Sequence, residues 1–189
     1  MTTLTAGAIT GSTIRANSLG TLKVIGNKKA ALTADMTGAH VTLLGAGVAA
    51  TKPTLGTFTV TGTVRNSDVS VGGNVTTVSA LGFVGSNFYA GFTGTEAGVG
   101  TFLPAAAVKT FTVKGAKGVT DAFQDSNLIA TSLGTVKFQS VKAANGGTKF
   151  GVIVDQTIGS LKVTSPAFTY VPGGLNPQTI GPDFEVKIV

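Results

Sequence analysis

The chain has 189 residues and a net charge of +6, with 42% hydrophobic residues and no cysteine. This composition excludes disulfides, thiolate metal sites and an intrinsically disordered polymer. Its basic residues are scattered singly apart from one adjacent pair, Lys28-Lys29, whereas nucleic-acid binding needs them clustered, so we expect no nucleic-acid partner.

Short strands are the predicted elements, because glycine, threonine and valine are abundant and only 12% of residues are charged. In chain order, strands with a Thr-apolar-polar-apolar pattern begin near residues 3, 21, 40, 57, 77, 110, 135 and 160. Several follow the phrase aliphatic-Gly-Thr/Ser, as in 19–24, 55–60, 133–138 and 158–163. A step of about twenty residues is typical of one coil of a parallel β-solenoid.

A second phrase, which starts with serine and continues as a strand, precedes some of the Leu-Gly-Thr strands. It occurs at 12–16, 67–71, 86–90 and 126–130. The recurrence of the whole phrase predicts an all-β single-stranded parallel β-helix (β-solenoid) of about seven to eight coils. An antiparallel sandwich with the same strands is the alternative. Residues expected to face inward are Ile14, Leu22, Val24, Val69, Val71, Phe88, Leu128, Val136, Phe138, Ile153, Leu161 and Val163.

Two stretches break the period. Residues 93–107 predict a loop that protrudes from a coil, and residues 167–183 are rich in proline and glycine before a last alternating strand at 183–189. We therefore divide the domain into solenoid repeats, 1–166, and a C-terminal capping segment, 167–189. Serine and threonine at the corners of the coils are expected to form hydroxyl ladders.

The beginning of the chain shows no basic and apolar signal segment, and no apolar run is long enough to span a bilayer. The pattern starts in mid-repeat at Thr3. We expect Met1 to be non-native and the chain to be the tail of a longer protein.

The phrases at 14–24 and 158–163, together with the ending at 183–189, resemble the C-terminal repeat regions of very large secreted or cell-surface proteins of environmental bacteria. The resemblance covers nearly the whole chain. It implies an extracellular β-helical module, and it supplies no catalytic residues.

Candidate chemistry is sparse. Asp125 and Asp155 are the best-placed acidic pair, but their repeat positions differ, and Asp125 suits a turn. His40 is the only histidine and is typical of a polar strand residue. The Gly-Gly pairs at 72–73 and 146–147 lack the aspartate of a calcium-binding repeat. We expect no catalytic residues, no metal site and no cofactor.

Ligand-binding candidates come from the repeat itself. Lys23, Lys137 and Lys162 occupy the same outward position, which suits either an acidic polysaccharide or simple protection of the surface. Tyr89 and Phe92 are expected to form an exposed aromatic pair for a sugar ring, with Phe88 in the core. A regular Thr-x-Thr array of the kind that binds ice is not continuous in the sequence.

These patterns predict a non-catalytic structural or adhesive module of a large extracellular or cell-surface bacterial protein, which self-associates by end-to-end or edge stacking. A carbohydrate-binding module for acidic polysaccharide is the alternative. A β-helical polysaccharide-degrading enzyme is a third reading.

Overall fold

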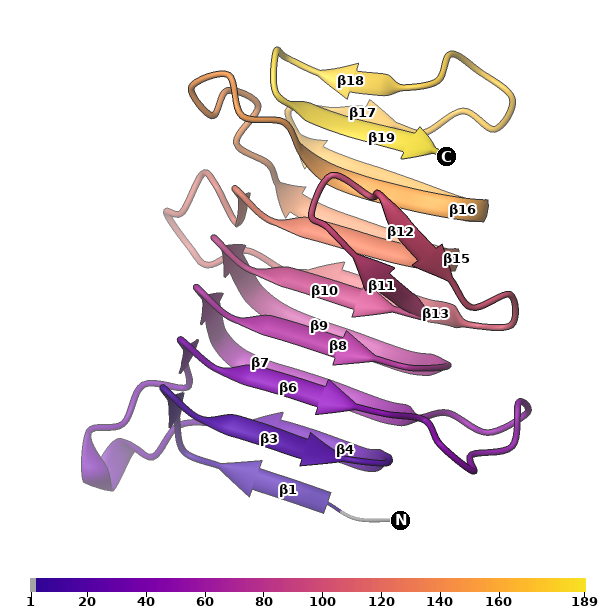
Figure 1. Cartoon of the computed structure of the whole chain (residues 1–189). Coiled ribbons are helices and arrows are strands. Elements are labelled where there is room, and N and C mark those ends of the chain that lie inside the picture. Colours follow the sequence, from indigo (N-terminus) through magenta and orange to yellow (C-terminus); the bar gives the residue numbers. More distant parts are fainter. Residues whose placement is uncertain (1–2) are drawn as a thin grey trace.

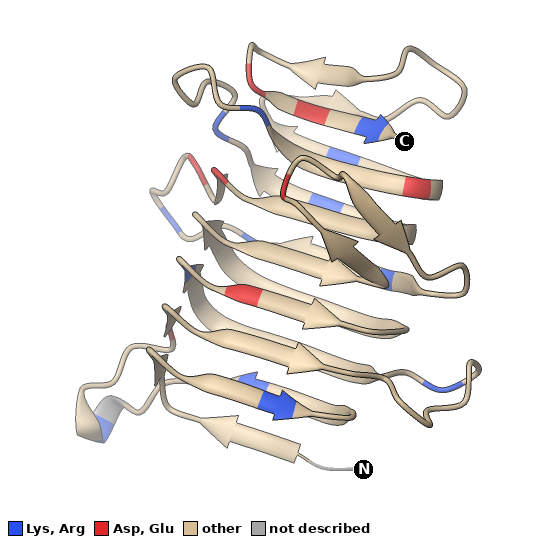
Figure 2. Ribbon diagram, in the orientation of Figure 1, with Lys and Arg blue, Asp and Glu red and all other residues tan. Residues whose placement is uncertain are grey.

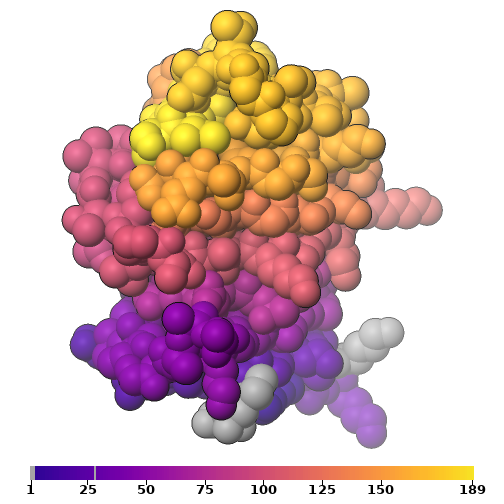
Figure 3. All heavy atoms as spheres, turned by 90° about the vertical axis from the view of Figure 1, so that its right-hand side faces the viewer, coloured from indigo at the N-terminus to yellow at the C-terminus, as the bar shows by residue number. Residues whose placement is uncertain are grey.

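The computed structural model describes residues 3–189, so Met1 and Thr2 lie outside the described residues. Strands are nearly all of the chain's regular secondary structure, and the short 3-10 helix η1 (Lys28–Ala30) is the one helical element in the described part. Seventeen strands form one large, curled and mostly parallel sheet, and two more form a small hairpin (Figure 1). Successive segments of sequence are stacked as bands from one end of the molecule to the other (Figure 3). The predicted all-β, parallel architecture is confirmed at this level.

One set of parallel pairings, which we call ladder B, joins the strands of the Leu-Gly-Thr phrase. Its threonines pair in a continuous register from Thr3 through Thr57 and Thr110 to Ser160. The strands are β1 (Thr3–Ala6), β4 (Leu19–Val24), β7 (Leu55–Arg65), β9 (Val75–Val84), β13 (Ala107–Val113) and the second halves of β15 (Asn127–Ser140) and β16 (Phe150–Ser165).

In the last two copies of the Leu-Gly-Thr phrase, steric contacts explain why the second residue is glycine. A Cβ atom on Gly134 would lie 2.4 Å from the carbonyl oxygen of Lys109, and one on Gly159 would lie 2.8 Å from that of Gly134. Adjacent strands approach too closely there for any side chain.

A second set of parallel pairings, ladder A, joins the strands of the serine phrase. It runs through β3 (Thr13–Ala16), β6 (His40–Leu43), β8 (Asp68–Val71), β10 (Asn87–Ala90), the first halves of β15 and β16, and β19 (Phe184–Ile188). The strand near residue 40 therefore belongs to ladder A. Its prediction within the ladder B series is wrong, because the Thr-apolar-polar-apolar pattern is common to both.

A third, shorter set of pairings, ladder C, lies between the end of ladder B and the start of ladder A. It comprises β2 (Ile9–Thr10), β5 (Met36–Thr37), the ends of β7 and β9, and β14 (Phe123–Gln124), with a bridge from Phe123 to Val141. The chain passes from A to B to C and returns to A one strand further along.

The inner side of all three ladders is packed with aliphatic and aromatic side chains. Phe58, Phe88, Phe111 and Phe138 form a continuous row whose ring centroids are 5.9, 5.6 and 6.1 Å apart. Phe88 is fully buried in this core, as predicted. Edge-to-face ring contacts stabilise a structure beyond the effect of burying apolar area. This row therefore stabilises contacts between successive strands of the two ladders.

Serines at the bend before ladder A form the predicted hydroxyl ladder. Ser86 Oγ accepts a hydrogen bond from the backbone N–H of Ser67 at 3.1 Å, and Ser126 Oγ accepts one from Ser86 at 3.0 Å. Ser67 Oγ continues the series by accepting from Ala39 N–H at 3.0 Å. All three serines are buried.

The segment predicted to protrude at 93–107 instead folds back on the outer side of ladder A. β11 (Phe92–Gly94) and β12 (Gly100–Phe102) form an antiparallel hairpin, and Phe92 packs against Ile129 and Ile153. The inward placement predicted for Ile153 is wrong. Val152 and Val154 face the core, and Ile153 lies between them on the opposite side, covered by the hairpin.

The C-terminal end contains strands of reversed direction. β17 (Phe168–Thr169) pairs antiparallel with β16, and β18 (Gln178–Ile180) pairs antiparallel with β19. The last alternating strand was predicted correctly and joins ladder A as β19. Asp183, just before it, accepts hydrogen bonds from the backbone N–H groups of Asn145 and Gly147, and these bonds lower the pKa of its carboxyl group.

Candidate ligand-binding site

A pocket of about 270 Å³ lies between the outer side of ladder A and the β11–β12 hairpin. Its lining comes from three adjacent ladder A strands, β6, β8 and β10, and from the hairpin. The polar side chains that line it are His40, Thr42, Asp68, Ser70, Tyr89, Thr93 and Glu96. Strand alternation places the first five on the outer side of the sheet, since their neighbours in sequence face the core.

Asn87 connects the two carboxylates of this pocket. Its Nδ2 group donates to Asp68 Oδ1 at 3.0 Å and to Glu96 Oε1 at 2.8 Å. The Oδ1 atom of Asn87 accepts from the backbone and side-chain N–H groups of Asn127 at 3.2 and 3.1 Å. The orientation of this buried amide is therefore set by Asn127, and its donors face the carboxylates.

His40 and Tyr89 complete the polar part. His40 Nδ1 lies 3.3 Å from Asp68 Oδ2, and both side chains are exposed. Burial raises the pKa of the Tyr89 hydroxyl, and the negative charges of Glu96 and Asp68 raise it further. The Tyr89 phenol thus stays protonated and remains a hydrogen-bond donor.

The arrangement is rich in acceptors. The Asn87 donors are already used by the two carboxylates, so the other carboxylate oxygens, of which Asp68 Oδ2 also lies 3.3 Å from His40 Nδ1, would meet a ligand as acceptors. A half-buried tyrosine ring borders them. Hydroxyl groups of a sugar ring are donors that fit such a lining.

The predicted aromatic pair is brought together, with ring centroids of Tyr89 and Phe92 5.9 Å apart. The prediction that both are exposed is wrong, because Phe92 is only 5% exposed. Phe92 packs on Phe102, with centroids 4.6 Å apart, and thereby anchors the hairpin. Of the pair, Tyr89 is left to contact a ligand.

The lysines of the repeat are partly brought together. Lys137 and Lys162 are register neighbours on β15 and β16, as predicted, and both are exposed. Lys23 occupies the same column, but Thr59, Ser79 and Thr112 stand between it and Lys137. At about 4.8 Å per strand, Lys23 lies roughly 19 Å from the pair.

Asp125 and Asp155 are not brought together. Asp125 precedes the ladder A strand of β15 and has the positive φ of a turn, +46°, whereas Asp155 follows the ladder A strand of β16. The register places them about six residues apart along the strand direction, roughly 20 Å. Among residues 3–189, no group of three or more acidic or histidine side chains is placed to hold a metal ion.

Sequence reasoning missed Asp68, Asn87 and Glu96 as a group. Asp68, Asn87 and Asn127 each follow the serine of the serine phrase, and His40 shares their register position. Glu96 reaches them only because the hairpin folds back, and no local pattern indicates that.

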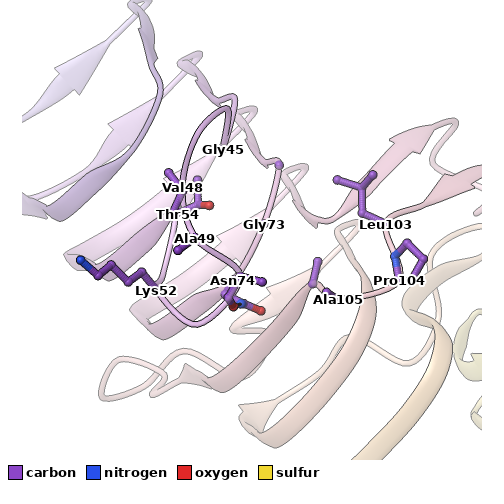
Figure 4. A pocket seen from close by; sticks show the side chains of 13 residues that line it. Gly45, Val48, Ala49, Lys52, Thr54, Gly73, Asn74, Leu103, Pro104 and Ala105 are labelled. Carbon is purple, nitrogen blue, oxygen red and sulfur yellow. Dashed lines mark hydrogen bonds between the residues drawn. The ribbon is translucent and has the colours of Figure 1, made fainter.

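A second pocket, of about 230 Å³, lies at the corner between ladders A and B (Figure 4). Asn74 is its main polar group, and it donates to Ala50 O at 2.6 Å and accepts from Ala107 N–H at 2.9 Å. Lys52 points away from Leu103 and Pro104 in Figure 4. The polar groups here hold three loops together.

Comparison of the chain with protein-family models, with characterised proteins and with solved structures finds no match. Across the described residues, no helix has the length and apolar character needed to cross a membrane.

Proposed function

We propose that the chain is a single-stranded parallel β-solenoid that serves as a non-catalytic structural or adhesive module of a large extracellular or cell-surface bacterial protein. The observation that carries the proposal is the unbroken register of ladder B from Thr3 to Ser160. Each circuit through ladders A, B and C is then one coil. Because every coil pairs with the next along its backbone, the module is a stiff rod whose strands are stacked about 4.8 Å apart.

Self-association is part of this proposal, and its support lies at the β1–β3 end. In the described part of the chain, β1, β2 and β3 each pair with a neighbour on one side only. The core side chains of this end, Leu4 and Ile14, are only partly buried. Free parallel edges beside apolar side chains accept further strands, whereas the reversed strands β17 and β18 oppose such pairing at the other end.

The test is sedimentation velocity of the 189-residue chain across a wide range of concentrations. We expect a concentration-dependent dimer that Leu4→Lys abolishes, since a lysine at the open end repels its copy. Val119→Lys is the matched control, because Val119 is exposed in a loop away from this end. A chain that stays monomeric, or a dimer that both variants weaken equally, contradicts the proposal.

Acidic polysaccharide is the second candidate partner. The paired residues of ladder B include exposed lysines and no aspartate or glutamate. Blue segments mark lysines on the strands at the back of Figure 2. A face of one charge sign attracts a polymer of the opposite sign and concentrates it near the surface. Binding of polyanionic and neutral glycans to the immobilised chain, compared at low and high salt, tests this. Equal binding of both glycans would contradict it.

A further inference from the structure

A groove of about 430 Å³ on ladder B is lined by three lysines, two on β15 and β16 and one just beyond the end of β13. Lys137 and Lys162 are direct register neighbours on β15 and β16. Lys114 follows the end of β13, two residues beyond Thr112, which pairs with Lys137. Lys114 is thus a diagonal neighbour of Lys137, within reach of long side chains.

The remaining lining of this groove is neutral. It comprises Thr112, Gln139 and Thr164, whose side chains are polar, and Val113 and Phe138. No carboxylate lines the groove, and in the described part of the chain no ion pair within 4.0 Å joins any of its lysines to an acidic group. All three lysines are exposed, so they are free to turn toward a common ligand.

Two lysines side by side on adjacent parallel strands repel each other, which costs stability. An anion placed between them removes the repulsion and adds charge-assisted hydrogen bonds. Neutral donors at the rim, the Gln139 amide and the Thr164 hydroxyl, suit the remaining oxygens of a sulfate or carboxylate group.

We propose that the groove formed by Lys114, Lys137 and Lys162 binds an oxyanion group, sulfate or carboxylate, of a polyanionic polysaccharide that lies along ladder B. The inference rests on the proposed adhesive function and names its ligand site. Lys23 contributes little, because hydroxyl side chains on three strands separate it from the groove.

The chain offers a control that is matched in charge. Lys137→Gln/Lys162→Gln removes two charges from the groove, and Lys29→Gln/Lys52→Gln removes two exposed charges outside ladder B. The probes are dextran sulfate, polygalacturonate and uncharged dextran, measured by calorimetry at about 0.15 M ionic strength, where the Debye length is about 8 Å. We expect the groove variant to lose at least about tenfold in affinity for a polyanion, and the control variant less than about threefold, since exposed charges at a distance are largely screened.

Inorganic sulfate should displace the polyanion better than sodium chloride does at equal ionic strength. Equal losses in the two double variants, equal displacement by both salts, or no binding of either polyanion would overturn the proposal. Duplex DNA that binds as tightly as dextran sulfate would overturn the assignment to polysaccharide.

Sedimentation of the same variants separates this inference from the proposed self-association. A chain that dimerises but binds no polyanion contradicts the groove alone. A chain that binds polyanion through the groove but never dimerises contradicts the self-association alone.

Discussion

Ser86→Ala tests whether the serine ladder stabilises the bend before ladder A. Ser86 is fully buried, and its Oγ is the acceptor for the backbone N–H of Ser67. The other partner of this hydroxyl, the carbonyl of Val84, keeps a second hydrogen bond from Asn66 N–H at 3.0 Å. The N–H of Ser86 itself remains bound to Ser126 Oγ. The substitution therefore leaves one buried N–H group without a partner.

An unsatisfied buried donor of this kind costs about 1–3 kcal/mol of unfolding free energy. For a domain of this size, each kcal/mol lowers the midpoint temperature by roughly 2–4 °C, so we expect a decrease of roughly 2–12 °C. Equilibrium unfolding in urea, followed by far-ultraviolet circular dichroism, measures the free energy. The slope m should stay constant, since the surface exposed on unfolding is unchanged.

Ser79→Ala is the matched control. Ser79 lies on the outer side of ladder B and is partly exposed, so its removal should change the unfolding free energy by less than about 0.5 kcal/mol. If Ser86→Ala and Ser79→Ala have the same effect, the serine ladder contributes nothing beyond ordinary surface hydroxyls, and the reasoning is refuted.

Three further predictions concern the hairpin and the titrating groups. Gly98→Val should displace the hairpin and speed proteolytic cleavage within 92–103, because a Cβ at Gly98 would lie 2.7 Å from a side-chain carbon of Ile153 on β16. Gly118→Val is the control, since Gly118 has a similar φ but lies in open space, and it should not speed cleavage there. The pKa of the Asp183 carboxyl group is lowered in the folded state. Its contribution to the free energy of unfolding is therefore present above the unfolded pKa of about 3.9 and is lost as pH falls through the folded pKa. In urea, the unfolding free energy of Asp183→Asn should depend less on pH between about 5 and 3 than that of the unsubstituted chain. The chain has two tyrosines, so a Tyr170→Phe variant reports on Tyr89 alone. Because the pKa of Tyr89 is raised, this variant should show no tyrosinate absorbance at about pH 11 while the fold persists. Tyrosinate absorbance at that pH would contradict the burial of the Tyr89 phenol.

Ladder B could be predicted from sequence because its signal is local. The Leu-Gly-Thr phrase fixes which residues face inward, and a one-residue slip would expose all of them. The phrase therefore predicts the strands and their register, and the aligned copies do pair, as in Leu19 with Leu55 and Thr21 with Thr57. It does not predict which strands are neighbours, because the strand near residue 40 stands between these two in the predicted series. Ladder C could not be predicted, because two-residue strands such as β5 carry no periodic pattern.

The candidate sites were harder to predict than the fold because they depend on contacts between segments that are distant in sequence. Ile153 has the same apolar character as Val152 and Val154, and only the hairpin above it explains an isoleucine on the outer side of the sheet. Lys114 lies beyond the end of its strand and outside the repeated phrase. Its place in the groove follows from the register of β13 with β15, which no single segment encodes.

The two broad ladders have different outer surfaces, and the difference bears on where a partner binds. The hairpin covers part of ladder A and adds a carboxylate, so the pocket there carries the acidic groups Asp68 and Glu96. Ladder B is not crossed by the hairpin, and the charged side chains among its paired residues are all lysines. Under the proposed binding, a polyanion would be repelled by the ladder A pocket and attracted by ladder B, so we expect the module to present ladder B to an anionic polymer. Neutralising Asp68 and Glu96 should leave polyanion binding unchanged, since the core separates that pocket from the groove at Lys137 and Lys162.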